Sequence, residues 1–473
     1  MPKLIRSRFG LFCLGVLAVF VDWSTFAIAE TPQSESATLT VPKTVVDGNN
    51  LGFKISGLKP SEVVRLHALR SLEKWRNDNG KWMRVRQALH AFVDFKASSS
   101  GTIDVDTATP IRGTYQEPDS LAILRSGYRF GDPALKDVKV LDEALLAKEP
   151  ADRVHLKLER DGQIAVEAGF RIVDSAPGLK FEEVKGAGWH AVYAWPVNQS
   201  NLRTVVSLHG SEGGSIGKAR GRAAQFASQG FATLAMNYFA YPHEAIPGVP
   251  DKHLEIKIEN LQAARDWLSK RKEVDASHFA VHGVSKGAEF SLVAASHYPW
   301  ITKVVAVVPS DIVWEGYAAD AGRSTARSSW SIAGKPLPFV PLFSFDPNLD
   351  GLYRTNTERY DRSRQCFADQ ATAARIPIEK TNAKMLLLAS DRDEVWSSGS
   401  MSRNIAEQLV LANKQKQLAL KIYPTAGHQI AGTGTFPVRL YGEQSNDATS
   451  KDIVAEGTAA ADAWRRTIKF LRE

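Results

Sequence analysis

The segment around Ser285 constrains the fold more than any other part of the chain. Gly283–Gly287 has the pattern G-x-S-x-G with Ser285 at its centre, the apolar run Phe279–Val281 precedes it, and the apolar, helix-like run Phe290–Ala295 follows it. This order of strand, sharp turn and helix is typical of a nucleophile elbow, where small residues let the backbone take a strained turn. We therefore expect Ser285 at the tip of a sheet, above the N-terminus of a helix.

Beyond Pro177-Gly178 the hydrophobic pattern alternates between buried strands and amphipathic helices. The expected strands are Val205–Leu208, Phe231–Met236, Val304–Val308, Met385–Leu388 and Leu418–Tyr423, and the expected helices are Ala219–Ser228, Ile256–Lys270 and Ser402–Asn413. Such alternation predicts an α/β fold, a doubly wound and mostly parallel sheet with helices on both faces. Residues 322–360 are irregular and rich in Ser, Pro and aromatic residues, which indicates a lid-like insert.

The region before this alternation has the pattern of an antiparallel β domain. Val154–Leu158 alternates apolar and polar residues, and Asp161-Gly162 separates it from the similar run Ile164–Phe170, which predicts a hairpin. Phe53–Ile55 and Ala91–Phe95 fit further short strands. We therefore predict a β-sandwich domain over residues 39–177, ahead of a catalytic α/β domain over residues 178–473.

The first residues have the pattern of a secretory signal. An apolar run, Phe9–Val21, follows three basic residues and precedes the small-residue site Ala27–Ala29. We expect a signal peptide over residues 1–29 and a flexible leader over residues 30–38. The chain would then be exported, periplasmic or secreted, without stable membrane insertion after cleavage, and an uncleaved N-terminal anchor is the alternative.

Charge and cysteine content exclude several classes of function. The formal net charge is +7, and it becomes smaller once the basic signal peptide is removed. The sequence has no basic stripe with interleaved aromatic residues. We therefore expect no nucleic-acid partner. Of the two cysteines, Cys13 lies in the predicted signal, so Cys366 remains as an idle thiol without a disulfide partner. The histidine spacing gives no H-E-x-x-H or comparable pattern, so no metal site is expected.

A serine nucleophile requires a base and an orienting carboxylate, which on an α/β-hydrolase sheet follow in the order serine, acid, histidine. His428 lies in a glycine-bearing loop after the strand Leu418–Tyr423 and is the only histidine beyond His297, so order selects it as the base. The acid should follow the strand Met385–Leu388. Spacing alone does not choose among the three carboxylates there, Asp391, Asp393 and Glu394.

Acyl transfer also requires backbone N–H donors for the oxyanion. One donor would be the N–H of Lys286, directly after Ser285, and the second would come from the glycine-rich loop His209–Gly214, with Gly210, Ser211 and Gly213 as candidates. The side chains of His209 and Glu212 either line the pocket or shape this loop. We expect His282 to pack beside its strand rather than act as a base. A serine mechanism of this kind uses no cofactor.

Five stretches together resemble one known family. They are His209–Gly214, Gln229–Tyr238, Gly283–Glu289, Asp393–Ser397 and Tyr423–His428. The chain resembles the acyl-CoA thioesterase / bile acid-CoA:amino acid N-acyltransferase family of α/β-hydrolases over nearly its whole length after the leader. The resemblance implies an N-terminal β-sandwich, Ser285 as nucleophile, His428 as base and Asp393 as acid, with Asp391 as the fallback.

Two features depart from the family pattern or narrow its chemistry. Gln429–Thr435 stands where the family usually has an acidic, proline-rich stretch, so the acyl-chain and headgroup preferences do not carry over. Members that conjugate acyl groups to amino acids have a cysteine nucleophile, so Ser285 favours hydrolysis. Because an exported enzyme would rarely meet acyl-CoA, we expect a small-molecule acyl ester or thioester as substrate.

The sequence leaves three other functions open. An acyltransferase would use the same three residues with an amine or alcohol as acceptor. A peptidase would cleave an amide on the same fold. A non-catalytic binding protein would use the β-sandwich as an adhesion module and would not react with a serine-directed probe.

Overall fold

The computed structural model describes residues 36–78, 81–138, 146, 150–318, 324–343, 355–437 and 453–473. Within it, Ala37–Glu473 form one compact unit. The predicted signal peptide at 1–29, most of the leader at 30–38, and part of the lid-like insert at 322–360 lie outside the described residues.

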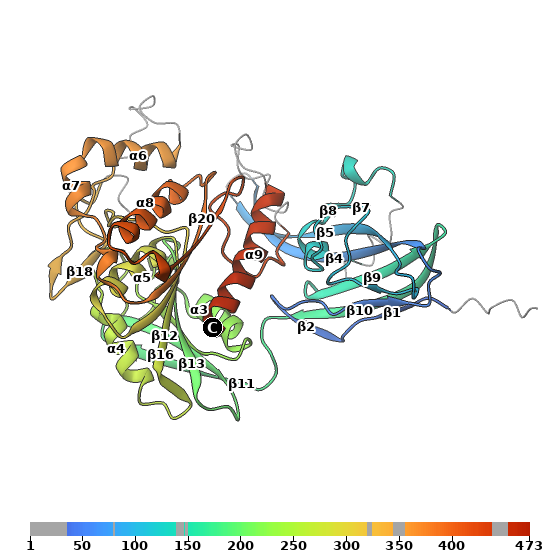
Figure 1. Ribbon diagram of the computed structural model, residues 1–473, viewed down its shortest axis with the longest axis horizontal. Coiled ribbons are helices and arrows are strands. Elements are labelled where there is room, and N and C mark those ends of the chain that lie inside the picture. The colour runs from blue at the N-terminus through green and yellow to red at the C-terminus, as the bar shows by residue number, and fades with distance from the viewer. Residues whose placement is uncertain are drawn as a thin grey trace, which may run out of the picture. The chain divides into compact units, whose positions relative to one another are not determined.

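Two β-sheets built from residues 38–173 pack around a common core (Figure 1). The smaller sheet has the order β1-β3-β6, formed by Thr38–Thr40, Lys54–Ser56 and Ile103–Asp104. The larger has the order β2-β10-β9-β4-β5-β7, with β8 on β5. Its strands are β2 Thr44–Val46, β4 Val63–Asp78, β5 Lys81–Lys96, β7 Arg112–Gly113, β8 Tyr128–Arg129, β9 Arg153–Arg160 and β10 Gln163–Val173. Strands of both sheets contribute core side chains, among them Ile55 and Val93.

The predicted hairpin is confirmed, whereas the prediction of only short strands is wrong. Asp161 and Gly162 join β9 to β10, and their positive φ angles of 50° and 74° are those of the turn that D-G favours. In contrast, β4 and β5 are 16 residues each and pair along their whole length. The outer part of this hairpin has ion pairs such as Arg86 with Glu73, so backbone pairing continues where the apolar alternation has ended.

An eight-stranded sheet follows, with the order β11-β12-β14-β13-β16-β17-β20-β21. The strands from β14 to β21 are parallel, and β11 and β12 are antiparallel additions at one edge. This arrangement confirms the doubly wound, mostly parallel sheet. The strands are β11 Leu179–Gly186, β12 Trp189–Pro196, β13 Leu202–Leu208, β14 Ala232–Asn237, β16 Val274–Val284, β17 Ile301–Val307, β20 Lys384–Ser390 and β21 Leu418–Tyr423.

Helices cover both faces of this sheet (Figure 1). Helices α3 (Ile216–Ala227) and α9 (Ile453–Arg472) pack on one face, and α4 (Glu259–Leu268), α5 (Lys286–His297) and α8 (Ser398–Leu411) on the other. Neighbouring valines of one strand point to opposite faces, as the period of two requires: Val205 contacts the α9 side and Val206 the α5 side.

One predicted helix begins later than expected. Ile256–Lys257 is not helical but forms strand β15, which pairs with β18 (Trp330–Ile332), and β18 pairs in turn with β19 (Lys335–Pro336). The backbone of this segment is therefore hydrogen-bonded to a partner distant in sequence, so α4 begins only at Glu259. Further α-helices within the described ranges are α1 (Ala122–Arg125), α6 (Asn356–Cys366) and α7 (Ala368–Ala373).

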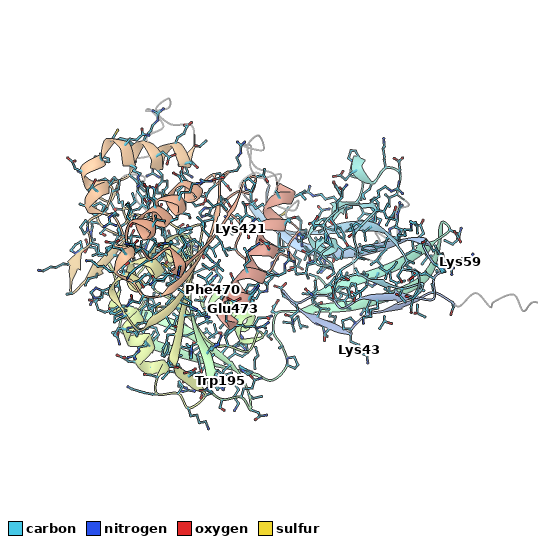
Figure 2. The ribbon with its side chains drawn as sticks, in the orientation of Figure 1. Lys43, Lys59, Trp195, Lys421, Phe470 and Glu473 are labelled. Atoms are coloured by element: carbon cyan, nitrogen blue, oxygen red, sulfur yellow. The ribbon has the colours of Figure 1, made fainter. Side chains whose placement is uncertain are left out.

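The last turn of α9 is tied to the sheet. Phe470, labelled in Figure 2, lies in this turn, and Glu473, also labelled, follows the end of the helix. Lys303 of β17 donates a hydrogen bond to the carbonyl of Phe470 at 2.8 Å. A cation near the last carbonyls of a helix stabilises the end where partial negative charge gathers. In the described part of the chain, no helix has both the length and the apolar character needed to cross a membrane.

Candidate active site

Ser285 occupies a strained turn between β16 and α5. Its φ and ψ are 54° and −118°, a region that residues other than glycine rarely adopt. Its N–H donates to the carbonyl of Val307 at 2.9 Å, which fixes the turn to strand β17. The two glycines of the motif are needed because no side chain fits at their positions. A Cβ at Gly283 would lie 2.0 Å from the carbonyl oxygen of Gly287, and a Cβ at Gly287 would lie 2.4 Å from that of His209.

His428 lies in the loop after β21 and points at Ser285. Its Nε2 is 3.1 Å from Ser285 Oγ, and both side chains are buried. The backbone N–H of His428 donates to Glu394 Oε2 at 2.8 Å, which anchors the loop to the segment after β20. The distance between the imidazole and the hydroxyl is within the range for direct proton transfer.

Of the three carboxylates after β20, the structure places Asp393 against the histidine. Asp393 Oδ1 is 2.8 Å from His428 Nδ1. The same carboxylate accepts the backbone N–H of Val395 at 3.0 Å and the hydroxyl of Ser398 at 2.6 Å, so its orientation is fixed from several sides. Asp391 instead forms a bidentate ion pair with Arg403, at 2.8 and 2.9 Å.

The surroundings of His428 favour its protonated form. Burial alone disfavours the imidazolium, but the charge of Asp393, its hydrogen bond, and the nearby carboxylates of Glu394 and Glu456 outweigh burial, so the pKa of His428 is raised above its ordinary value. An imidazole with a raised pKa is a stronger base toward a hydroxyl proton, and the carboxylate stabilises the cation that then forms.

The glycine-rich loop after β13 lies directly beside the serine. A Cβ on Gly210 would be 3.3 Å from Ser285 Cβ. The N–H of Gly210 donates to Glu212 Oε1 at 3.1 Å, so this expected oxyanion donor already has a partner within its own loop. Gly213 has a φ of 76° and abuts the ring of Tyr241, whose hydroxyl donates to the Ser211 carbonyl at 3.0 Å.

Lys286 contributes more than the backbone N–H that the sequence suggested. As the first residue of α5 it has an N–H without an intrahelical partner, next to Ser285. Its side chain is also buried, and Nζ lies 2.9 and 2.8 Å from the two carboxylate oxygens of Glu289. Burial lowers the pKa of Lys286 and raises that of Glu289, and each charge opposes the shift of the other.

Glu289 connects the elbow to a distant segment, and the sequence analysis missed this contact. Its Oε1 accepts the backbone N–H of Trp314 at 3.1 Å and the indole N–H of Trp330 at 2.7 Å, in addition to Lys286. A lysine and a glutamate three positions apart, in a helix whose other side chains are mostly apolar, were the available signal.

The other histidines near the sheet are structural. His282 packs against Phe226, and burial lowers its pKa to about 4. His209 stacks on Tyr238 with ring centres 4.2 Å apart, and burial holds its pKa well below the ordinary value. Both therefore remain neutral near pH 7. Among the residues that the structure describes, no group of three or more histidine, cysteine, aspartate or glutamate side chains could hold a metal ion.

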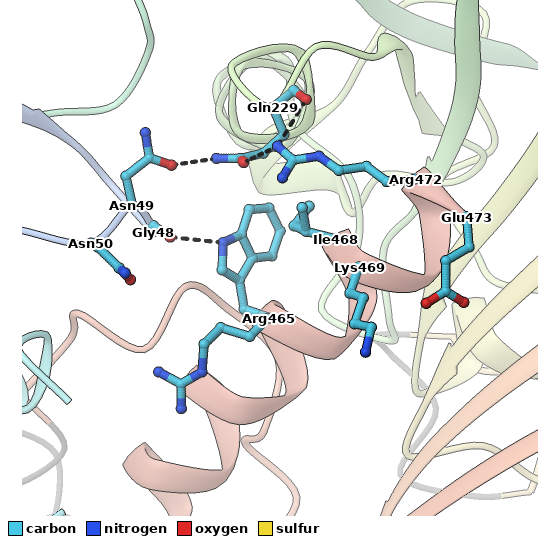
Figure 3. A pocket seen from close by; sticks show the side chains of 10 residues that line it. Gly48, Asn49, Asn50, Gln229, Arg465, Ile468, Lys469, Arg472 and Glu473 are labelled. Carbon is cyan, nitrogen blue, oxygen red and sulfur yellow. Dashed lines mark hydrogen bonds between the residues drawn. The ribbon is translucent and has the colours of Figure 1, made fainter. Parts of the chain in front are cut away.

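A separate cavity of about 530 Å³ lies beside the C-terminal half of α9 (Figure 3). Trp464 and Arg472 of α9 line it together with Gly48 and Gln229. The Trp464 indole donates to the Gly48 carbonyl at 3.1 Å, and Arg472 donates to the side-chain oxygen of Gln229 at 2.9 Å. Ser285 and His428 do not line this cavity.

Two family models match the chain. Residues 49–129 match the acyl-CoA thioester hydrolase/BAAT N-terminal region, and residues 256–473 match the BAAT / acyl-CoA thioester hydrolase C terminal. Together they cover more than half of the sequence, and they fall on the two architectural parts described above.

Curated relatives align along almost the full length. The chain is 22% identical to acyl-coenzyme A amino acid N-acyltransferase 2 of Mus musculus, with 92% of this chain and 97% of the relative covered. It is 23% identical to the mitochondrial acyl-coenzyme A thioesterase 2 of Rattus norvegicus, with 89% and 86% covered. A putative dienelactone hydrolase structure from Klebsiella pneumoniae has 15% identity and a TM-score of 0.38, with 62% and 99% covered. Both family models, with the two curated acyl-coenzyme A relatives, show that the chain belongs to the acyl-CoA thioester hydrolase / bile acid-CoA:amino acid N-acyltransferase family of α/β-hydrolases.

Proposed function

We propose that the chain is a serine hydrolase that cleaves a small-molecule acyl ester or thioester. The observation that carries this proposal is the continuous path from Ser285 Oγ through the His428 ring to Asp393, at 3.1 and 2.8 Å. Three side chains from distant parts of the sequence meet at one edge of the sheet in the geometry that activates a hydroxyl. The names of the relatives, acyl-coenzyme A thioesterase and N-acyltransferase, support an acyl substrate.

The mechanism follows from these positions. Ser285 Oγ attacks the carbonyl carbon while its proton passes to His428 Nε2, and Asp393 stabilises the imidazolium through Nδ1. The N–H of Lys286, at the N-terminus of α5, stabilises the oxyanion, whereas the N–H of Gly210, the second donor expected from the sequence, is bonded to Glu212. The imidazolium then gives its proton to the oxygen or sulfur of the leaving group as its bond to the carbonyl carbon breaks, so that an alcohol or thiol departs and an acyl-serine remains. Water, deprotonated by His428, releases the acid in the reverse sequence.

Acyl transfer is the second candidate, because the relatives include an N-acyltransferase. It differs only in the last step, where an amine or alcohol would replace water. Product analysis with and without an added amine separates the two functions: hydrolysis yields the free acid at the same rate in both, whereas transfer yields an amide at the expense of the acid.

We also propose that residues 1–29 direct export. The support is the sequence pattern alone: a basic start, the apolar run Phe9–Val21 and the small-residue site Ala27–Ala29. One relative is named as mitochondrial, so export would set this chain apart from it. Mass spectrometry of the N-terminus of the expressed protein tests this. A mature chain that starts at Glu30 supports the proposal, and an intact N-terminus in the cytoplasmic fraction contradicts it.

The decisive experiment on the hydrolase compares Ser285→Ala with the wild type on p-nitrophenyl esters and acyl thioesters. We expect kcat/KM to fall by about 10^4-fold or more, and fluorophosphonate labelling to disappear. Ser296→Ala is the matched control, because Ser296 lies on the same helix and its hydroxyl donates only to the Leu292 carbonyl at 2.8 Å. Equal turnover by Ser285→Ala and the wild type would refute the serine mechanism.

A further inference from the structure

We propose that the N-terminal sheets hold the loop of the catalytic base in place through Asp47, Thr433 and Thr435, which we call the Asp47 clasp. This inference rests on the proposed function of His428 as base and gives the N-terminal sheets a role in the reaction. The three residues are positioning residues, since they act through the loop that begins at His428.

The clasp joins two segments that are 386 residues apart. Asp47 directly follows β2, and its N–H donates to the Val173 carbonyl at 2.9 Å, so its backbone belongs to the larger N-terminal sheet. The hydroxyl of Thr433 lies 2.9 Å from both carboxylate oxygens of Asp47, and the hydroxyl of Thr435 donates to the same carboxylate. One carboxylate therefore binds two hydroxyls of the loop.

A second side chain of the same sheet reaches this loop. Arg70, on β4, is buried and donates to the carbonyl of Thr435 at 3.3 Å. Burial lowers the pKa of Arg70 to about 10, opposed by the charge of Asp47, so the guanidinium stays positive near pH 7. Thr433 and Thr435 are themselves buried, with 5% and 8% of their surface exposed. Their hydroxyls lie 3.1 Å from each other, and Asp47 is the acceptor that both of them share. A buried hydroxyl that loses its acceptor is costly.

The opposite side of the loop rests on α9. The N–H of Gln429, the residue after His428, donates to Glu456 Oε1 at 2.7 Å. Gly434 packs so closely on α9 that a Cβ there would lie 2.4 Å from that of Ala461. The loop is thus held between α9 and the N-terminal sheets, and the clasp supplies the contacts on the sheet side.

Thr433 and Thr435, the two residues that bind Asp47, both lie in the stretch Gln429–Thr435 that directly follows His428. A catalytic imidazole must be held within about 0.5 Å of its productive position, so freedom in the loop after His428 is expected to reduce turnover.

The test replaces the hydroxyls with methyl groups of the same shape, in the double variant Thr433→Val/Thr435→Val of the full chain. We expect kcat for a p-nitrophenyl ester to fall about tenfold, because small misplacements of catalytic groups cost one to two orders of magnitude. KM should change less than twofold. Thr433→Ser/Thr435→Ser keeps both hydroxyls and should restore kcat.

Thr458→Val is the matched control. The Thr458 hydroxyl also links α9 to the N-terminal part, through Glu117 Oε1 at 2.9 Å, but it lies outside the loop. Its loss should leave kcat unchanged. If the double variant does not fold by circular dichroism, the single variant Asp47→Asn, which keeps the shape of the side chain, replaces it with the same expected direction.

A double-mutant cycle that combines the clasp variant with His428→Ala separates an effect on the position of the base from a general loss of stability. If the clasp acts through the base, removing it in the His428→Ala background should not lower the residual rate further. An equal fall in both backgrounds, or no fall in the His428-containing protein, overturns the clasp proposal. Wild-type turnover that depends on Ser285 shows at the same time that the hydrolase proposal stands, so the two can fail separately.

Discussion

Asp391 and Asp393 are two positions apart, and the difference between them lies in their hydrogen-bond partners. Both follow the same strand, and either could end a strand or cap a helix, so spacing alone does not separate them. In the fold, the Asp391 carboxylate pairs with Arg403 of α8. The Asp393 carboxylate instead forms hydrogen bonds with the His428 ring, the backbone N–H of Val395 and the Ser398 hydroxyl. The resemblance to the family favoured Asp393, and the geometry agrees with that preference.

This contrast predicts different effects for two isosteric substitutions. Asp393→Asn should lower kcat by about 10^4-fold, because an amide no longer holds the proper imidazole tautomer or stabilises the cation. Asp391→Asn should change kcat less than about twofold, because it only weakens a surface ion pair with Arg403. Steady-state kinetics on one ester checks both. A larger fall in kcat for Asp391→Asn than for Asp393→Asn would show that Asp391 is the residue that orients His428.

The carboxylates around His428 also predict the pH dependence. His428 must be neutral to accept a proton, so kcat/KM should fall as the pH drops through its pKa. Because that pKa is raised, the acid limb should lie above the ordinary histidine value of about 6.5.

Glu456→Gln removes one of the charges that raise this pKa and keeps an acceptor for the N–H of Gln429. The acid limb of the kcat/KM profile should therefore move to lower pH, while the plateau at high pH stays unchanged. Glu407→Gln removes an exposed charge on α8 that is not among the main causes of this shift, and it should leave the limb in place. If Glu456→Gln leaves the acid limb of the kcat/KM profile unchanged, the limb reports the titration of a group other than His428.

At the scale of single elements, helix α5 combines two unusual features in its first turn. It begins at the strained serine, and it contains the fully buried pair of Lys286 and Glu289. Burying two charges costs much of what their attraction returns, so such a pair adds little net stability. Its indole and backbone partners, Trp330 and Trp314, indicate that it fixes the helix start against the segment beyond β17.

Removing one partner of this pair should be costly. Lys286→Met leaves an uncompensated buried carboxylate, and we expect it to lower the free energy of unfolding by about 3–5 kcal/mol. The double variant Lys286→Met/Glu289→Leu removes both charges and should recover most of the loss. Arg327→Met, in the exposed pair with Glu255, should cost less than about 1 kcal/mol. Urea unfolding followed by circular dichroism measures all three, and a double variant as unstable as the single one would contradict this account.

At the scale of the whole molecule, the sequence predicts those elements that have a regular hydrophobic period. The alternation of buried strands and amphipathic helices predicts the six parallel strands β13, β14, β16, β17, β20 and β21, because each strand period and helix period can be recognised locally. It did not predict the antiparallel strands β11 and β12 at one edge of the sheet. The D-G turn of the β9–β10 hairpin is predictable for the same reason. The full length of β4 and β5 was not predicted, because the two strands stay paired through the backbone beyond the apolar alternation, where Glu73 forms ion pairs with Arg84 and Arg86.

Contacts between distant segments could not be predicted in the same way. The motif and the chain order select Ser285 and His428, since elbow and loop follow directly from their flanking strands. Nothing local in the sequence indicates that Asp47 binds the loop beyond His428, because that pairing depends on how two separately formed cores come together. The residues proposed to react can thus be selected from local sequence, whereas the contacts that position them depend on segments that are distant in the sequence.

The positive φ of Ser285 has a consequence for how homologues of this protein evolve. The backbone there adopts a conformation that glycine takes freely and serine takes only under constraint. Selection for stability alone would favour glycine at this position, so the serine persists only while the activity is of use to the cell. A homologue with glycine at the corresponding place would therefore be recognisable as a lineage that kept the scaffold and abandoned the reaction.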